Sequence, residues 1–548
     1  MQNYLLRMWA SLSLPGLLIG TLFFAVSLTP SLIPRPYVLQ GVLSGCSLAA
    51  GYGLGVFGRW LWLYLELPAF PPRIERAVKT LAVAGCAGLA IAFLWQAARW
   101  QNSVRSLMGI DPVETAEPLK LALIALLVFV VVIALARLFR ITFAFLSRKF
   151  EHVTPKPIAR LLGIFLALAL FWSVADGLLH KAGLRLADSS FRELDALIDS
   201  DLAPPADPRK TGSAASLIPW HDLGFRGREF VTSGPTAEKI GAFLHQPALE
   251  PIRVYVGLNA AETAKDRATL ALAELKRTGA FERSTLIVVV PTGTGWVDPA
   301  AMDTVEYLHH GDVASVALQY SYLTSWLSLL VEPSYGAEAG EALFKAVYGY
   351  WTTLPKDKRP KLYLHGLSLG SMNSERSADL FDVIADPFQG ALWSGPPFES
   401  AGWKSVTAGR EPGSPAWLPR FRDSSVIRFT AQKNALDIPG AKWGPMRIVY
   451  LQYASDPVTF FDPHSFYREP DWMKQPRGPD VSPYLTWYPV VTMLQLALDM
   501  AMATASPMGY GHVYAPEHYI DAWVAVTDPQ GLAPGDVERL KEMVSKRD

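Results

Sequence analysis

Long apolar runs fill the first third of the chain and stop near residue 183. Five stretches, near residues 9–29, 38–63, 78–98, 119–136 and 159–180, are long and apolar enough to cross a hydrocarbon core as helices. Arg7 before the first run would also suit a cleaved signal sequence, but four further runs follow it, which favours a retained helix. The pattern predicts an α-helical transmembrane domain of five spans over residues 1–183.

Lys and Arg residues are distributed unevenly between these runs. Eleven lie on the side of the amino terminus and four on the other side. Because basic residues collect on the cytoplasmic side of a membrane, the amino terminus is predicted to be cytoplasmic. An odd number of spans then carries everything after residue 183 to the opposite face of the membrane.

The pattern changes after residues 184–215, which are rich in turn-forming residues and read as a linker. Residues 216–548 alternate short apolar runs with amphipathic helical patterns such as Ala261–Thr278 and Ala337–Thr353. The strand-length runs are Ile252–Leu258, Thr285–Val290, Val313–Gln319, Lys361–Leu364, Gly390–Ser394 and Arg447–Gln452. This alternation predicts an α/β domain with a mostly parallel sheet and ligands at the carboxyl ends of its strands.

Composition narrows the possible functions. Lys plus Arg and Asp plus Glu both number 50, so the charge balance does not suggest a nucleic-acid partner. The two cysteines, Cys46 and Cys86, lie in apolar runs, and the sequence contains no zinc-type or disulfide spacing. The sequence also lacks a flavin or nicotinamide signature. We therefore expect no metal and no cofactor, and no residue pattern sets the oligomeric state.

One stretch carries a recognisable reactive motif. The apolar run from Lys361 ends in Gly366-Leu-Ser-Leu-Gly370, with Ser368 at its centre and a helical pattern after it. Glycines at the two flanking positions permit a sharp strand-to-helix turn that presents the serine hydroxyl above a sheet. The arrangement predicts a nucleophile elbow, in which the amide of Leu369 is the first oxyanion donor.

A nucleophilic serine needs a base and an orienting acid, and in this type of fold both follow the elbow, acid first. Asp456 comes directly after a predicted strand and before a proline, and Asp462 is the reserve candidate. His512 follows a glycine turn and precedes a helical pattern, whereas His518 lies on that helix and is the second choice. Ser368, Asp456 and His512 are the predicted catalytic triad.

A second oxyanion donor is expected in the loop after an earlier central strand. The segment Pro291-Thr-Gly-Thr-Gly-Trp296 follows such a strand, so the amide of Thr292 or Gly293 is the candidate. A glycine turn of this kind could also cradle phosphate. It lacks the lysine and the spacing of a P-loop, which disfavours the nucleotide-binding alternative.

These motifs resemble those of bacterial polytopic membrane proteins that carry a C-terminal α/β-hydrolase domain. The likeness covers nearly the whole chain, through residues 29–35, 255–259, 291–299, 319–322, 366–370, 393–397, 454–457, 476–483 and 518–523. It implies an α/β-hydrolase fold, the serine triad named above, and a multi-pass protein of the bacterial inner membrane whose catalytic domain faces the periplasm or exterior. At Leu367, members often carry an acidic residue.

The expected function is a membrane-anchored serine hydrolase that cleaves carboxylic esters through an acyl-enzyme. Alternatives are an acyltransferase acting on a lipid or envelope acceptor, and a non-catalytic binding protein of the same fold. Aromatic-rich insertions at residues 396–445 and 457–507 frame the predicted cleft. Within the second, the apolar stretch 484–503 is expected to be a core helix of the α/β domain, a lid, or an interfacial helix. The expected partners are the lipid bilayer and a small or lipid-like ester.

Overall fold

A computed structural model of the chain describes residues 12–68, 71–174, 177, 202–323 and 334–546. The chain forms two compact units: Met1–Arg185 together with Phe461–Met502, and Leu186–Phe460 together with Ala503–Asp548. Most of the predicted linker, residues 184–201, lies outside the described residues. The segment Phe461–Met502 belongs to the first unit although it is flanked in sequence by the second.

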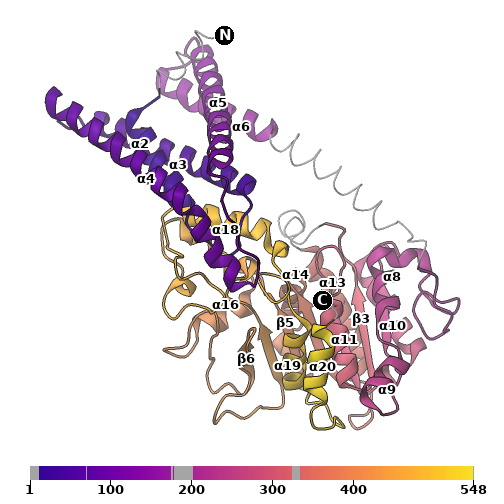
Figure 1. Cartoon of the computed structure of the whole chain (residues 1–548). Helices are drawn as coiled ribbons and strands as arrows, with labels where there is room; N and C mark the ends of the chain where they lie inside the picture. The colour runs from indigo at the N-terminus through magenta and orange to yellow at the C-terminus, as the bar shows by residue number, and fades with distance from the viewer. Residues whose placement is uncertain (1–11, 69–70, 175–176, 178–201, 324–333, 547–548) are drawn as a thin grey trace. The chain divides into compact units, whose positions relative to one another are not determined.

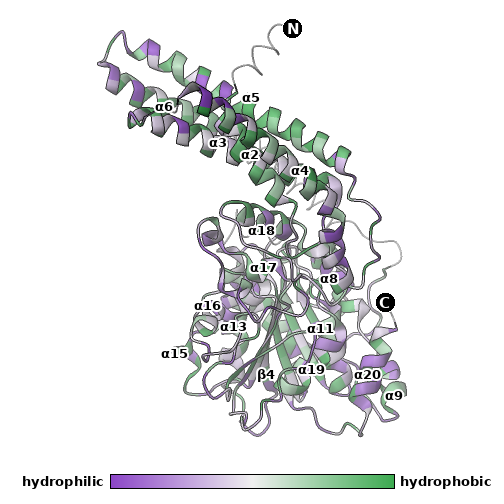
Figure 2. Ribbon diagram, turned by 60° about the vertical axis from the view of Figure 1, so that its left-hand side comes forward, coloured by the Kyte–Doolittle hydropathy of each residue, from purple (hydrophilic) through white to green (hydrophobic). Residues whose placement is uncertain are grey.

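The first unit is built from long apolar helices. These are α2 (Leu14–Ser27), α3 (Tyr37–Tyr64), α4 (Pro72–Leu107), α5 (Pro118–Phe150) and α6 (Lys156–Val174). Four of them, α3 to α6, are long and apolar enough to cross a membrane, and Figure 2 shows hydrophobic residues along them. Among the described residues α2 has only 14 residues, fewer than the ~20 that a span needs. The described residues thus contain four candidate spans, and the first of the five predicted spans, residues 9–29, lies partly outside the described residues.

Small residues let these helices approach closely. A Cβ added at Gly45 of α3 would lie 2.6 Å from the carbonyl oxygen of Ala125 in α5. One added at Gly51 would lie 2.8 Å from the carbonyl oxygen of Ile19 in α2. The glycine-rich sequence of α3 is thus used on two sides for backbone contact, as expected for helices that associate without a hydrophobic driving force between them.

Helix α18 (Val491–Ala501) packs against α2 and α3 within the first unit. Gln495 and Asp499 of this helix bind the turn after α2: Asp499 Oδ2 accepts a hydrogen bond from Leu32 N–H (3.0 Å), and Gln495 Nε2 donates one to Thr29 O (3.0 Å). The same unit contains the short helices η4 (Pro463–Phe466) and η5 (Asp471–Met473). The expectation that residues 484–503 form a core helix of the α/β domain is therefore wrong.

The second unit contains a seven-stranded sheet in which every neighbouring pair is parallel. The strands are β1 (Ile252–Val256), β2 (Thr285–Val290), β3 (Val313–Leu318), β4 (Lys361–Leu367), β5 (Gly390–Ser394), β6 (Ile427–Thr430) and β7 (Arg447–Leu451), in the order β1-β3-β2-β4-β5-β7-β6. All six predicted strands are present. The seventh, β6, lies at the sheet edge and has only four residues, one of them Arg428, so it has little apolar signal.

Nearly every residue of the strands is buried, so both faces of the sheet must be covered. The helices that cover it form two groups. Helices α10, α13 and α14 pack side by side, and α19 packs with α11 and α20 (Figure 1). The helices of this unit are α8 (Gly224–Ser233), α9 (Ala237–Leu244), α10 (Ala264–Thr278), α11 (Pro299–Leu308), α13 (Tyr335–Trp351), α14 (Leu369–Ser377), α15 (Leu380–Val383), α16 (Ala401–Ala408), α17 (Pro457–Phe460), α19 (Pro516–Thr527), α20 (Asp536–Ser545) and the short η2 (Trp220–Leu223), η3 (Ala280–Glu282) and η6 (Ala503–Ala505).

The strand register aligns four carboxyl ends at one edge of the sheet. Val290 of β2 is paired with Gly366 of β4, Leu367 of β4 with Ser394 of β5, and Ser394 with Leu451 of β7. The loops that follow these strands therefore start side by side. They contain the predicted oxyanion loop, Ser368 and Asp456.

Candidate active site

Ser368 occupies a strained turn between β4 and α14. Its backbone has φ 58° and ψ −129°, a region that residues other than glycine rarely adopt, and its N–H donates to the carbonyl of Ser394 in β5 (3.0 Å). Strain of this kind costs on the order of 1–3 kcal/mol and persists only where the surrounding structure enforces it. The serine is 5 % exposed. The geometry is that of a nucleophile elbow.

The two glycines of the motif are required by close backbone contacts. A Cβ at Gly366 would overlap the carbonyl group of Gly370, because the turn folds α14 back onto the end of β4. A Cβ at Gly370 would overlap the carbonyl of Val290 at the end of β2. The Gly-x-Ser-x-Gly spacing is therefore a packing requirement here, and the second glycine brings the start of α14 against the oxyanion loop.

Asp456 and His512 form a buried pair. His512 Nδ1 lies 2.7 Å from Asp456 Oδ2, and the two side chains are 7 % and 0 % exposed. Four more donors fix the carboxylate. The Tyr514 hydroxyl (2.7 Å) and the Thr459 hydroxyl (3.2 Å) donate to Oδ2, and the N–H groups of Val458 (2.8 Å) and Thr459 (3.4 Å) donate to Oδ1. With this many donors, the acid holds the imidazole in one orientation.

The pairing assigns the tautomer of His512. Because a carboxylate only accepts, Nδ1 carries the proton and the lone pair remains on Nε2. Nε2 is buried and makes no hydrogen bond with any residue that the structure describes, Ser368 included. The imidazole packs on Gly395, where a Cβ would lie 2.6 Å from its Cε1. Gly395 directly follows Ser394, whose carbonyl accepts the hydrogen bond from Ser368 N–H. His512 and Ser368 therefore contact two consecutive residues at the end of β5.

The loop that carries His512 is tied to the acid loop. Gly509 and Gly511 have φ values of 85° and 58°, which form the tight turn before the histidine. The N–H of Gly511 donates to Ser455 Oγ (2.9 Å), and His512 N–H donates to Ala503 O (3.1 Å). These bonds fix the histidine backbone relative to the residue that precedes Asp456.

The backbone amides predicted to bind the oxyanion differ in whether they already have a hydrogen-bond acceptor. Leu369 is the first residue of α14, where an amide has no acceptor within its own helix. The amide of Thr292 instead donates to Trp296 O (3.0 Å) within its own turn, so its choice as a donor is wrong. Gly293, the alternative from the same loop, remains the predicted second donor.

The reserve candidates stand apart from the pair. His518 Nδ1 bonds the hydroxyl of Tyr453 (2.6 Å), and Tyr453 stacks on Tyr514, so His518 supports the aromatic packing behind the acid. Asp462 belongs to the first unit, where it caps η4 by accepting a hydrogen bond from His464 N–H (2.8 Å). Neither residue bonds to Asp456 or His512.

Two buried residues near the pair were not predicted. Tyr514 bonds the acid, and its position two residues after the histidine gives no signal without the fold. Asp298 caps α11 by accepting from Ala300 N–H (2.9 Å) and also accepts from the Tyr519 hydroxyl (3.0 Å). Burial raises the pKa of Asp298 to about 7, while these hydrogen bonds and the nearby His512 oppose the shift. Its sequence signal is the Asp-Pro pair after the oxyanion loop, which marks a helix start.

The described residues contain no group of three or more His, Cys, Asp or Glu side chains that could hold a metal ion. The arrangement of a strained serine, a carboxylate-bound imidazole and a free helix-terminal amide is suited to acyl transfer through the serine oxygen.

Comparisons with known proteins agree with this geometry. Residues 252–540 match the sequence profile of a family described as alpha/beta-hydrolase family, and residues 28–235 match that of the alpha/beta-hydrolase family N-terminus. Neither the curated proteins nor the solved structures contain a match.

Proposed function

Because the chain belongs to the alpha/beta-hydrolase family, we propose that it is a membrane-anchored serine hydrolase that cleaves carboxylic esters. Ser368 Oγ attacks the acyl carbon while His512 Nε2 accepts its proton, and Asp456 holds the resulting imidazolium. Leu369 N–H, with a second amide at Gly293, binds the oxyanion. His512 then protonates the leaving alcohol. Water, activated by the same nitrogen, releases the acyl group from Ser368.

A single observation supports this mechanism more than any other: His512 Nδ1 lies 2.7 Å from Asp456 Oδ2 while Nε2 has no partner among the described residues. A histidine that only supports packing would be expected to use both nitrogens or to lack a buried acid. Here the unused nitrogen is the one that general-base catalysis requires, and the neighbouring β4–α14 turn presents a serine.

The membrane location and substrate class are inferred from the first unit. Four helices that are long and apolar enough to span a bilayer would hold the enzyme beside acyl chains, which favours esters with an apolar or lipid-like acyl group. The excess of Lys and Arg on the amino-terminal side favours a cytoplasmic amino terminus, and the α/β unit then lies outside the cytoplasm if the predicted first span, residues 9–29, crosses the membrane together with the four helices.

The proposal is tested with the full-length protein in detergent and a fluorophosphonate probe, which reacts with activated serines. The wild type is expected to be labelled, Ser368→Ala to be unlabelled and Ser405→Ala, which alters an exposed serine on α16, to label as the wild type does. His512→Ala should reduce the labelling rate by at least a hundredfold. Equal labelling of wild type and Ser368→Ala would refute the mechanism, and no labelling with no ester turnover would favour a non-catalytic binding protein.

A further inference from the structure

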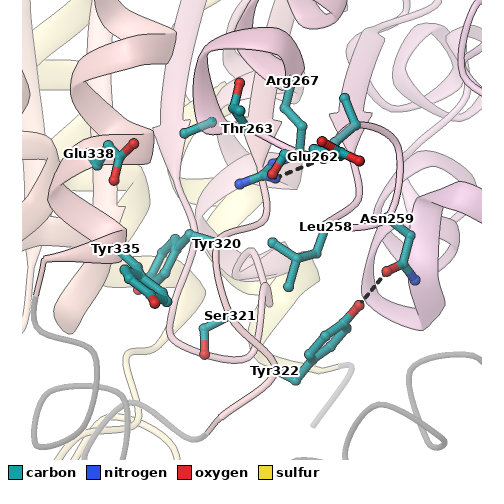
Figure 3. Close-up of a pocket in the computed structure, with 12 residues that line it drawn as sticks. Leu258, Asn259, Glu262, Thr263, Arg267, Tyr320, Ser321, Tyr322, Tyr335 and Glu338 are labelled. Atoms are coloured by element: carbon teal, nitrogen blue, oxygen red, sulfur yellow. Dashed lines mark hydrogen bonds between the residues drawn. The ribbon is translucent and has the colours of Figure 1, made fainter.

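A cavity of about 720 Å³ lies in the α/β unit away from the candidate triad. It opens beyond the carboxyl ends of β1 and β3 and is lined by the loops that follow these strands and by the first turns of α10 and α13 (Figure 3). Ser368, Asp456 and His512 do not line it. Its volume is within the range of pockets that hold small organic molecules.

Among the described residues in the wall of this cavity, Arg267 of α10 is the one cation. The residue is 7 % exposed, and its Nη1 donates to Ala261 O (2.9 Å) and Glu262 O (3.1 Å). These two bonds lock the guanidinium plane. Its Nε–H is buried and has no acceptor, and the guanidinium has no ion-pair partner, among the residues that the structure describes.

Burial lowers the pKa of Arg267, and the attraction of Glu338, Tyr322 and Asp266 offsets this only in part. A buried cation that is compensated only in part is costly, so Arg267 in the wall of a cavity calls for a closer partner. The locked geometry defines what that partner is. Because Nη1 donates to two carbonyls, the donors left on Arg267 are Nε and Nη2, which share one edge of the guanidinium and match two oxygens of a carboxylate or phosphate. Glu262 and Glu338 also line the cavity, but both are exposed, so water and salt screen their charges.

The rest of the wall suits an organic group attached to such an anion. Figure 3 shows Tyr320 and Tyr335 across the cavity from Arg267, with Leu258 between Arg267 and Tyr322 in this view. The hydroxyl of Tyr322 is held by Asn259 Oδ1 (2.9 Å), which leaves its ring as a fixed apolar surface. Aromatic rings on one side and a fixed cation on the other can bind a molecule that has an apolar body and one anionic end.

We propose that this cavity binds a small organic molecule through a carboxylate or phosphate group paired bidentately with Arg267. The site is separate from the triad and does not depend on the hydrolase activity proposed above. The anion could be a free metabolite or the headgroup of a lipid, and the shared chemistry is the two-oxygen contact with Nε and Nη2.

The test measures binding of phenyl phosphate and benzoate to the full-length protein in detergent, by calorimetric titration at constant ionic strength. Saturable binding is expected for the wild type, and benzyl alcohol, which has the ring without the charge, should bind at least tenfold more weakly. Arg267→Met and Arg267→Lys should each raise the Kd for phenyl phosphate at least tenfold. Lysine keeps the charge but loses the two-donor edge, so it tests the geometry even if the methionine variant does not fold.

The matched control is Lys265→Met, which removes an exposed charge from the same turn of α10 and should leave the Kd unchanged. An equal Kd in wild type and both Arg267 variants, or no saturable binding of either anion, would overturn the proposal. Competition by dioctanoyl phosphatidic acid against phenyl phosphate separates the two sources. Displacement indicates a lipid headgroup, and retained phenyl phosphate indicates a small soluble anion.

Discussion

Asp298 offers a direct test of how burial controls charge in the α/β unit. Its carboxyl is 6 % exposed and accepts hydrogen bonds from Ala300 N–H and the Tyr519 hydroxyl. Burial raises its pKa from the ordinary 3.8 to about 7. Between these two pH values the folded unit keeps a proton on Asp298 that the unfolded chain has released.

The sign of the effect on stability follows from this difference. Because the folded state has the higher pKa, the stabilisation from the bound proton is fully present below the unfolded pKa and is lost as the pH rises through about 7. A shift of about three units at 1.36 kcal/mol per unit corresponds to about 4 kcal/mol. Asp298→Asn has nearly the same shape and cannot ionise. The wild type should therefore lose up to about 4 kcal/mol relative to this variant between pH 4 and pH 8.

Thermal unfolding of the full-length protein in detergent, at pH 5, 6, 7 and 8, measures this difference. The Tm of Asp298→Asn minus that of the wild type is expected to rise with pH by several degrees. Asp357→Asn, which changes an exposed aspartate, should follow the wild type at every pH. A difference between Asp298→Asn and wild type that stays constant from pH 5 to pH 8 would show that Asp298 does not titrate in this range, and the argument from burial would be wrong.

Two further substitutions probe one hydrogen bond in each unit. Tyr514→Phe keeps the ring and removes a donor to Asp456, so kcat for an ester is expected to fall about tenfold with KM nearly unchanged. Steady-state kinetics measure this change, with Tyr467→Phe at an exposed position as the control. An unaltered kcat in Tyr514→Phe would contradict the prediction. Asp499→Ala leaves the amide of Leu32 without its acceptor and should lower the unfolding free energy of the first unit by about 1–3 kcal/mol. Thermal unfolding in detergent beside exposed Asp111→Ala measures the loss, and equal Tm values for the two variants would refute it.

The features that sequence predicts correctly here are those set by neighbouring residues. Strands buried on both faces appear as continuous apolar runs, and six of the seven were found this way. The elbow is specified by glycines that lie two positions on either side of Ser368, because both meet backbone from adjacent elements. Asp456 and His512 are predicted as partners from their places after a strand and before a helix, and the structure brings their side chains to 2.7 Å; their catalytic roles stay a prediction.

The features that sequence misses depend on contacts far along the chain. Thr292 and Gly293 have similar sequence contexts, and only the turn itself shows that the Thr292 amide is paired with Trp296 O. Tyr514 resembles any aromatic residue until its hydroxyl is seen on Asp456. Gln495 and Asp499 are polar residues within an apolar stretch, a pattern that indicates buried partners. Nothing local could identify those partners as Leu32 and Thr29, more than 460 residues away in the sequence.

The path of the chain adds a constraint on the candidate triad. The acid loop ends at Phe460, and the segment Phe461–Met502 then folds with the amino-terminal helices before the chain returns at Ala503, whose carbonyl accepts the N–H of His512. The acid and the base are therefore joined by a segment whose packing partners, α2, α3 and the turn at Thr29–Leu32, all belong to the first unit. The loops of the candidate acid and base are therefore separated in sequence by a segment that buries its apolar face in the first unit.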